Sequence, residues 1–584
     1  MNAKKRNRCF VRRFMALALI LSLLASVSAC KPKKTAEQEQ ELFDAFTNEL
    51  FASDITENII NLHWTLAFPE NYGIEDYEIS FGDLSEEYEE ETFEELRNVL
   101  KELNDFDYEL LSKEQKLTFD ILKTYAEDNL KTEGFRLYYD YLSPTNGVQS
   151  YLPTLLAEYK FYKEQDVKDY LDSLRLFPDY FANVMAFEQE QADAGFFMPD
   201  FEADKVIDQC QQFMEDPEHH YLIDSFNLRL EETDFLEEAD KESYREENRQ
   251  LIQDTVIPAY GYLVEELSKL KGSATNDAGL YYFENGREFY RLLVRDSTGS
   301  DKSVEELEDT ILDNMQRALE TIWTMDLDGD VFDRMLECPV DLSDPYEVLE
   351  LLKEGIAQDF PVPGDLPFEV NYVPASMEEY MNPAYYILPP IDYLENNVIY
   401  INNSLSSDDI EQFVTLAHEG FPGHLFQTTY FYGRQPSRIR KLFGFSGYSE
   451  GWGTYAEIYA YQLSGIDDDL LLLNALNKTY TLSLYCLADI GINYEGWTLE
   501  DTQDFLGIDE DTSREIYEIL VEEPALYLAY YGGYLEFMEL REKAEETLGE
   551  KFNLKDFHTF LLDVGPAQFE IIEEQMEAWM EEQA

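Results

Sequence analysis

Apolar residues recur at helical spacing along most of this chain, and that periodicity constrains its fold more than any other feature. Leu117, Ile121 and Tyr125, for example, return on one face of a predicted helix. Similar amphipathic stretches follow at 166–190, 202–214, 245–270, 303–325, 467–487 and 536–549. No internal repeat or long low-complexity linker divides the 584 residues. The pattern predicts a mainly α fold, with one large helical domain over residues 46–584.

Strand signals are confined to one short region of the sequence. The segments AYYILPP and NNVIYIN are rich in β-branched and aromatic residues, and the turn-prone PPIDYLEN separates them. We expect a small hairpin or edge sheet here, just before a helix that carries His418 near its end. Strand 397–402 would then offer an edge to which an extended peptide adds by main-chain hydrogen bonds.

The N-terminus has the composition of a secretion signal. Six basic residues and no acid accompany the apolar run MALALILSLLASVSA within residues 1–29. The ending VSAC resembles the bacterial lipobox, in which the cysteine, here Cys30, is lipidated. We therefore expect a signal peptide at 1–29, a lipidated polar tether at 30–45, and an extracytoplasmic protein that is lipid-anchored to the bacterial cell membrane. The alternative is an ordinary secreted protein that happens to have Cys30 at the cut.

The overall charge excludes one class of partner. The chain carries 121 acidic and 44 basic residues, a net charge of −77. Phosphates would be repelled, so nucleic acid is excluded as a partner. Solubility and colloidal repulsion outside the cell explain the charge most simply, and a preference for cationic peptides is a much weaker inference. The chain is expected to be a monomer.

The cysteines outside the N-terminal region are few. Cys210, Cys338 and Cys486 lie far apart with no C-x-x-C pattern. This spacing indicates neither a disulfide framework nor a thiolate metal site, and it leaves a single disulfide open.

The heptapeptide HEGFPGH, residues 418–424, brings together residue types that bind metals. It begins like H-E-x-x-H, in which two histidines four residues apart on a helix bind one zinc ion. A spacing of six on an unbroken helix would place the side chains about 120° apart. Pro422 lacks an N–H, and its ring clashes with the carbonyl of His418. We therefore predict a bulge or break between 420 and 423 that returns His424 to the side of His418.

The segment SGYSEGWGTYAEIYAYQL, downstream of this motif, predicts a second helix that carries carboxylates. Glu450 and Glu457 are seven residues apart and share a face of that helix. We predict that His418, His424 and Glu450 bind one Zn²⁺ ion. Glu457 is the expected acceptor that orients a ligand histidine, and the alternative is a solvated surface acid.

Glu419 then has a defined chemical role beside the predicted zinc site. It is the expected general base, which takes a proton from the attacking water and passes it to the leaving amine. The predicted function is zinc-dependent hydrolysis of peptides. Two other interpretations stay open: a catalytically silent peptide-binding lipoprotein that retains the cleft, and an acidic surface scaffold without metal.

A stripe of tyrosines follows near the C-terminus, in PALYLAYYGGYLEFMELREKAEE. Its members recur at helical spacing: Tyr527, Tyr530, Tyr531 and Tyr534. A phenol can donate a hydrogen bond to an oxyanion, and Arg541 on the same face can hold a peptide carboxylate. Packing is the plainer explanation for any single tyrosine, although two glycines within the stripe are unlike ordinary helical core. His558, in FHTFLLDVG, is a further candidate donor.

Taken together, these motifs resemble the bacterial family known as domain of unknown function 885. The resemblance rests on TLAHEGFPGHLFQ, SEGWGTYAE, DIGINYEGW and YYGGYLEFMELREKA, and it covers nearly all of the chain after the signal peptide. That family resembles gluzincin metallopeptidases of the oligopeptidase or carboxypeptidase type. The resemblance implies a two-lobed helical fold with a deep central cleft. It also implies His418, His424 and Glu450 as ligands, Glu419 as base and Tyr530 as oxyanion donor.

The chain departs from the family pattern at two places. The family usually has D-x-G-x-H where this chain has Asn493 at the last position, and P-G-Q where this chain has Ala525 in the middle. Since the metal motif is intact, we expect these departures to affect substrate contacts. The candidate substrate-binding residues are Arg541, Tyr527, Asn493 and His558.

Overall fold

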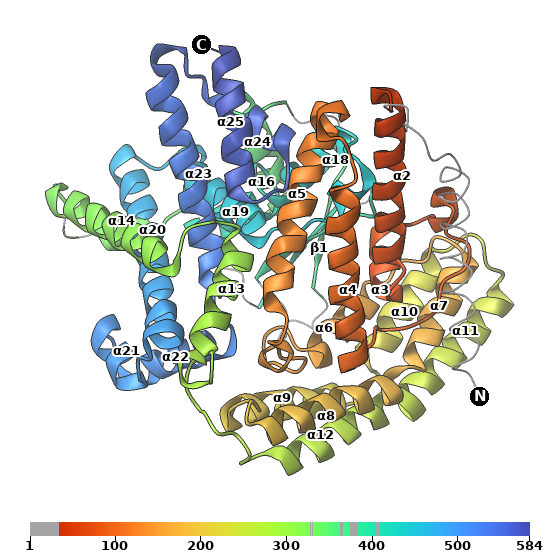
Figure 1. The fold of residues 1–584 in the computed structure, drawn as a ribbon. Coiled ribbons are helices and arrows are strands. Elements are labelled where there is room, and N and C mark those ends of the chain that lie inside the picture. Colours follow the sequence, from red (N-terminus) through yellow and green to blue (C-terminus); the bar gives the residue numbers. More distant parts are fainter. Residues whose placement is uncertain are drawn as a thin grey trace.

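The computed structural model describes residues 34–583, apart from 328, 330, 363–365, 374–382, 396 and 405–408. The predicted signal peptide and Cys30 lie outside the described residues. Helices dominate, as predicted, and Figure 1 shows the N-terminal α2, α4 and α5 standing beside one another. The helices up to residue 270 are α2 (Ala36–Ile55), α3 (Ile59–Thr65), α4 (Glu86–Leu103), α5 (Lys113–Asn129), α6 (Val148–Ala157), α7 (Glu164–Leu174), α8 (Phe177–Ala194), α9 (Asp200–Phe213), α10 (Tyr221–Glu232), α11 (Glu238–Leu251) and α12 (Ile257–Leu270).

Among the remaining helices, α25 ends next to the C-terminus and lies beside α23 (Figure 1). They are α13 (Gly286–Thr298), α14 (Val304–Thr324), α15 (Val331–Met335), α16 (Pro345–Gly355), α17 (Ile410–Glu419), α18 (His424–Gly433), α19 (Ser446–Ala460), α20 (Asp468–Ile490), α21 (Leu499–Leu506), α22 (Glu510–Glu522), α23 (Leu526–Leu548), α24 (Leu554–Val564) and α25 (Phe569–Gln583). Among the described residues, no helix combines the length and apolarity needed to cross a bilayer.

The predicted amphipathic stretches coincide with helices. The stretch 303–325 is α14, and 245–270 runs through α11 and α12 with one π-helical turn, Ile252–Val256, between them. The predicted tether is wrong from residue 36 onward. Thr35 and Gln38 form a capping box that starts α2, and this polar helix buries Phe43 and Phe51 on its inner face.

The two largest hydrophobic cores give the chain the predicted two lobes. One core is built mainly from α2 to α12, and the other mainly from α13 to α25. Strand β3 (Val398–Ile401) lies between them, because Val398 and Tyr400 belong to the first core and Ile399 and Ile401 to the second. This explains why all four residues of β3 are buried, since each face of the strand meets apolar side chains.

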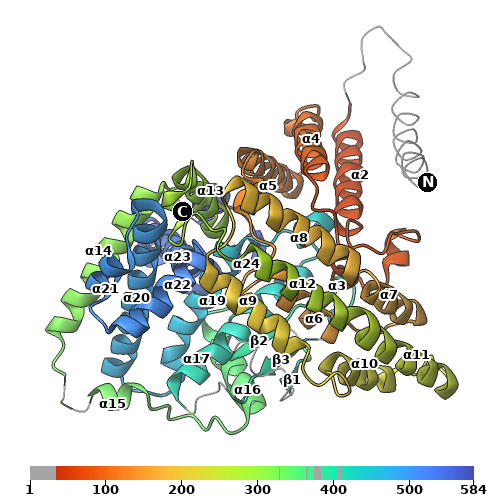
Figure 2. The ribbon, with the colours of Figure 1, turned by 90° about the horizontal axis from the view of Figure 1, so that it is seen from below.

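The sheet has three strands in the order β1–β3–β2 (Figure 2). Strand β2 (Ala384–Ile387) pairs antiparallel with β3, which confirms the predicted hairpin. Strand β1 (Glu369–Tyr372) pairs parallel with β3 on its other side and was not predicted. The prediction that 397–402 offers an edge is therefore wrong. The edge that lies beside α17 is that of β2.

The three cysteines beyond the N-terminal region are free, so no disulfide joins them.

Candidate metal centre

The histidine motif sits on two short helices that meet at a break. Asp409 caps α17, whose inner face, with Ile410, Phe413 and Val414, is fully buried. The helix ends at Glu419 and α18 begins at His424, so the break spans 420–423 as predicted. Only glycine fits at 423, because a Cβ there would come 1.7 Å from the His418 carbonyl oxygen.

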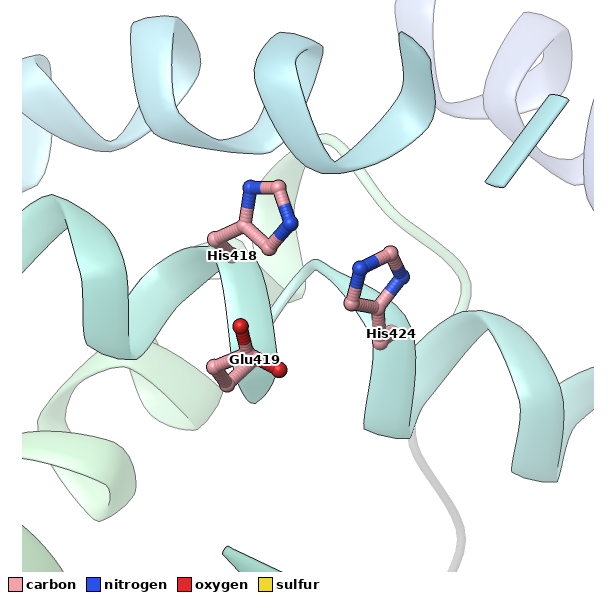
Figure 3. Close-up of side chains that lie close together, drawn as sticks. All are labelled: His418, Glu419 and His424. Carbon is pink, nitrogen blue, oxygen red and sulfur yellow. The ribbon is translucent and has the colours of Figure 1, made fainter. Parts of the chain in front are cut away.

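This break brings the two imidazoles together. The ring centroids of His418 and His424 lie 4.5 Å apart with the planes 86° from each other. Figure 3 shows the two rings close together, at the end of α17 and the start of α18, with Glu419 nearby. Ligand atoms of these three residues lie within 4.8 Å of one another.

Helix α19 supplies the further carboxylate. The Glu450 Oε2 atom lies 3.4 Å from His418 Nε2 and 3.6 Å from His424 Nε2. Ligand atoms bound tetrahedrally to zinc at 2.0–2.1 Å lie roughly 3.3–3.4 Å apart, so this set of two imidazoles and one carboxylate fits a zinc ion. The Trp452 indole N–H donates to the Pro422 carbonyl at 2.8 Å and so attaches α19 to the break.

Glu419 and Glu450 occupy different environments. The backbone N–H of Tyr386, on β2, donates to Glu419 Oε2 at 2.8 Å, which ties this carboxylate to the sheet. Glu450 Oε2 instead approaches both histidines. We therefore assign Glu450, rather than Glu419, as the third candidate ligand.

The two carboxylates also differ in acidity. Burial raises the pKa of Glu419. Burial acts the same way on Glu450, but hydrogen bonds to His418 and His424 hold its pKa well below the usual range. Two neighbouring carboxylates with opposite shifts are typical of sites where one is a permanent anion and the other exchanges a proton.

A buried ion pair lies behind His418. Glu457 Oε1 lies 2.7 Å from His418 Nδ1, which leaves Nε2 as the nitrogen that faces the site. Glu457 is buried, so it is not a surface acid. The Lys478 ammonium lies 2.5 Å from Glu457 Oε2. Burial by itself raises the pKa of Glu457, but Lys478 and His418 outweigh it and hold this pKa at about 2. The sequence analysis did not single out Lys478. Its isolation was a signal, because it is the one lysine or arginine between Lys441 and Arg514.

The tyrosine stripe lies on α23, which packs against α19 through glycines. A Cβ on Gly451 would come 2.4 Å from the Gly533 backbone, so neither helix could carry a side chain at this crossing. The close approach places the Tyr530 ring 6.3 Å from the His418 ring. Burial and then the nearby Glu450 raise the pKa of Tyr530, so its hydroxyl stays a hydrogen-bond donor.

Two predicted substrate contacts are wrong, because the residues are fully buried. Asn493 donates to Asp489 Oδ1 and to the Leu520 carbonyl, and it accepts from the Leu280 N–H. His558 has no exposed surface and bonds to Tyr455 and to the Asp359 carbonyl.

The other two candidate contacts are partly exposed. The Arg541 guanidinium donates to the Tyr455 hydroxyl at 3.0 Å, and Tyr527 packs against Tyr485. Their contact with a substrate stays a prediction, as does the deep central cleft.

The second departure from the family pattern has a structural consequence. Ala525, which precedes α23, has φ 67°, a left-handed conformation that glycine adopts without strain. Its N–H donates to Asp489 Oδ2 at 2.7 Å, and Asp489 is in turn bonded to Asn493. This buried network therefore fixes the start of the helix that carries Tyr530.

Comparison with known proteins gives the chain a family. The sequence profile of the family described as "Bacterial protein of unknown function (DUF885)" matches residues 69–576. The chain belongs to this family. No curated protein matches it.

Two solved structures share this family member's fold. One is a candidate lipoprotein from Colwellia psychrerythraea, with a TM-score of 0.80 and 19% identity, covering 93% of this chain and 99% of that one. The other is a candidate lipoprotein of unknown function from Shewanella oneidensis, with a TM-score of 0.62 and 16% identity, covering 91% and 99%. At these identities the likeness establishes the helical fold alone.

Proposed function

We propose that this DUF885 member is a zinc-dependent peptidase. The observation that carries the proposal is that Glu450 Oε2 lies 3.4 Å from His418 Nε2 and 3.6 Å from His424 Nε2, with a separate carboxyl, Glu419, beside the two histidines. Two imidazoles and a glutamate are the ligand set of hydrolytic zinc sites that keep one position open for water or substrate.

Each residue around the site has a distinct task in this proposal. His418, His424 and Glu450 would hold the zinc ion, which would supply a Lewis acid for the scissile carbonyl and the attacking water. Glu419 keeps Oε1 for the attacking water, because Oε2 accepts the Tyr386 N–H. Its raised pKa suits a base that takes a proton and then passes it to the leaving amine.

Two further groups complete the proposed reaction centre. The Tyr530 hydroxyl donates to the oxyanion that forms from the carbonyl. Strand β2 presents its outer edge beside Glu419, so an extended substrate adds to the sheet there. Glu457, held ionised by Lys478, keeps the His418 imidazole oriented.

The test is digestion of a peptide library by purified protein, read by mass spectrometry. We expect cleavage that a chelator abolishes and added zinc restores. Glu419→Gln should retain zinc and lose roughly 100- to 10,000-fold in rate, since it removes the proton acceptor. Glu288→Gln, at an exposed acid on α13, is the matched control. Cleavage by Glu419→Gln at the wild-type rate would overturn the proposal.

We also propose that Cys30 carries the lipid anchor predicted from the sequence. The two candidate lipoproteins of the same fold support this assignment. Metabolic labelling with a palmitate analogue should mark the wild-type protein and leave Cys30→Ala unlabelled. Equal labelling of both proteins would contradict the assignment.

A further inference from the structure

A small cavity of about 230 Å³ lies where the two lobes meet. Met198, on the loop before α9, belongs to the first hydrophobic core, and Leu280 and Phe289 belong to the second; all three line the cavity. Residues 521–524, at the end of α22 and before α23, close it from the second lobe. None of the residues assigned to the reaction centre borders it. Its volume is below the range of drug-sized ligand sites, so an occupant must be small.

The cavity lining is acidic, and none of the described residues that form it is a lysine, an arginine or a histidine. It contains four carboxylates: Asp140, Glu202, Glu522 and Glu523. One of these charges is neutralised from α9, because Lys205 pairs with Glu522 and lies 3.3 Å from Glu518. The other three carboxylates have no lysine or arginine partner in the described part of the chain.

Two of these three acids have neutral hydrogen-bond donors. The Gln191 amide donates to Asp140 Oδ1 at 3.1 Å. The Ser143 hydroxyl and the Asn146 amide donate to Glu523 at 3.1 and 3.3 Å. These donors satisfy some of the lone pairs of the two carboxylates and leave their charges unbalanced.

Glu202 is the carboxylate without a partner. It lies in the first turn of α9 and is 5% exposed, and it makes no hydrogen bond or ion pair with any residue in the described ranges. Burial, followed by the charges of Asp140 and Glu522, raises the pKa of Glu202. A buried carboxylate without a partner is costly, and a cation beside it would remove that cost.

The Glu202 carboxylate is accessible from the cavity. The acids that act on it most strongly, Asp140 and Glu522, line the same cavity from other elements. Its oxygens also retain accessible surface, unlike the two oxygens of Glu188 on α8, which the fold seals off. An occupant of the cavity can therefore contact Glu202 directly.

Aromatic rings make up much of the remaining lining. The ring centroids of Phe196 and Phe283 lie 5.2 Å apart, and that of Tyr138 lies 4.5 Å from Phe196. Aromatic faces attract ammonium groups that approach within about 6 Å. The lining therefore suits an organic cation, whose charge meets the acids and whose carbon atoms meet the rings.

A metal ion fits this lining less well. Within the described residues, the histidine motif is the single group of three or more side chains with metal-binding spacing, so the acids of the cavity do not converge on one point. An ammonium group has three N–H donors and a carbon chain, so it can serve separate acceptors without a common centre.

We propose that this cavity is a binding site for a small organic ammonium ion, with Glu202 as its main anionic contact. The walls come from both lobes, so a bound ammonium ion joins them and stabilises the folded chain. The inference is independent of the proposed peptidase function, since it needs neither the zinc ligands nor Glu419. A free alkylamine and the lysine side chain of a peptide share this chemistry, and two probes distinguish them.

The test is isothermal titration calorimetry with butylammonium chloride, because butylammonium has the charge and the carbon chain of a lysine side chain. The second probe is Nα-acetyl-lysine methylamide, which carries the same group on a peptide backbone, and butanol is the uncharged control ligand. We expect one saturable site per chain for butylammonium, and binding weaker by roughly tenfold or more in Glu202→Gln. Asp208→Asn, at an exposed acid on the same helix, should bind like the wild type.

Thermal unfolding separates a binding role of Glu202 from a structural one. Without ligand, Glu202→Gln should unfold at the same temperature as the wild type or a higher one, since it removes a buried charge that has no partner. Butylammonium should raise the Tm of the wild type and of Asp208→Asn, and raise that of Glu202→Gln much less. A lower Tm for ligand-free Glu202→Gln would make Glu202 a structural residue and count against the proposal.

The binding outcomes decide the assignment. No saturable binding of either ammonium probe, equal binding of butanol, or unchanged affinity in Glu202→Gln overturns it. Binding of butylammonium alone supports a site for free amines, and binding of the lysine probe supports a site for peptide side chains. A failed library digestion would count against the peptidase alone, because none of these titrations requires hydrolysis.

Discussion

The substitution Gly453→Ala tests how closely α19 and the histidine motif must fit. Gly453 lies on α19 against the His418 ring. A Cβ at this position would come 2.4 Å from His418 Cε1 and 2.7 Å from Nε2. Non-bonded carbons settle at about 3.5 Å or more, so the imidazole would have to move by about 1 Å.

A movement of this size exceeds what a metal site tolerates, since ligand distances hold to about 0.2 Å. We expect zinc affinity to fall at least 100-fold, roughly the upper end of losses that follow disruption of ligand-orienting contacts. The fold should survive, because alanine in a helix is favoured over glycine by about 1 kcal/mol. The effect should therefore appear in metal binding and not in helix content.

Competition against a chromogenic chelator measures the affinity, and circular dichroism checks the helices. Gly433→Ala is the control, because a Cβ at that position, the last of α18, would meet nothing within 4 Å. Wild-type zinc affinity in Gly453→Ala would refute the reasoning that His418 binds the metal in the position the structure gives it.

Four other outcomes follow from the same contacts. Glu457→Gln should weaken zinc binding roughly 10- to 100-fold in chelator competition, because the acceptor that orients His418 loses its charge. Ala525→Gly should raise the free energy of unfolding by about 1 kcal/mol in denaturant titration, since it relieves a left-handed φ of 67°. Tyr530→Phe should lower kcat roughly 10- to 1,000-fold with little change in KM, as expected for an oxyanion donor. Zinc loading at equilibrium should rise with pH. Burial lowers the pKa of His418, but hydrogen bonds to Glu450 and Glu457 outweigh burial and raise it. Protons therefore compete with zinc for His418 more strongly as the pH falls.

Each of these has a result that would count against it. Unchanged zinc affinity in Glu457→Gln would remove the orienting role. A less stable Ala525→Gly would mean that the loss of the methyl group outweighs the relief of strain. A KM effect without a kcat effect in Tyr530→Phe would indicate ground-state binding. Loading that is independent of pH would show that His418 is not the competing group.

The break in the histidine motif was predictable because its causes are local. Pro422 and the glycines around it act within one helical turn, and their effect on His418 and His424 follows from backbone sterics. The β2–β3 hairpin was predictable for the same reason. Strand β1 was not, because EVNY pairs in parallel with β3, and only tertiary contact brings these two segments together.

The errors concern burial, which spacing along a chain does not reveal. Asn493 and His558 have the chemistry of substrate contacts, yet neighbouring helices enclose both of them. The segment 36–45 is polar, but α2 buries one side chain per turn, and the apolar Phe43, Phe51 and Ile55 among them suffice to dock it. Glu450 was within reach of prediction because it lies seven residues before Glu457, on the same face of one helix. The approach of α19 to α23 was not, because it depends on glycines whose partners are about 80 residues away.

The most direct measurement is anomalous diffraction at the zinc edge from crystals of the protein grown with zinc. The account predicts one strong peak within bonding distance of His418 Nε2, His424 Nε2 and a Glu450 carboxylate oxygen, about 2.0–2.2 Å from each. A map without a peak at this position, or with the three side chains pointing away from any shared ion, would contradict it.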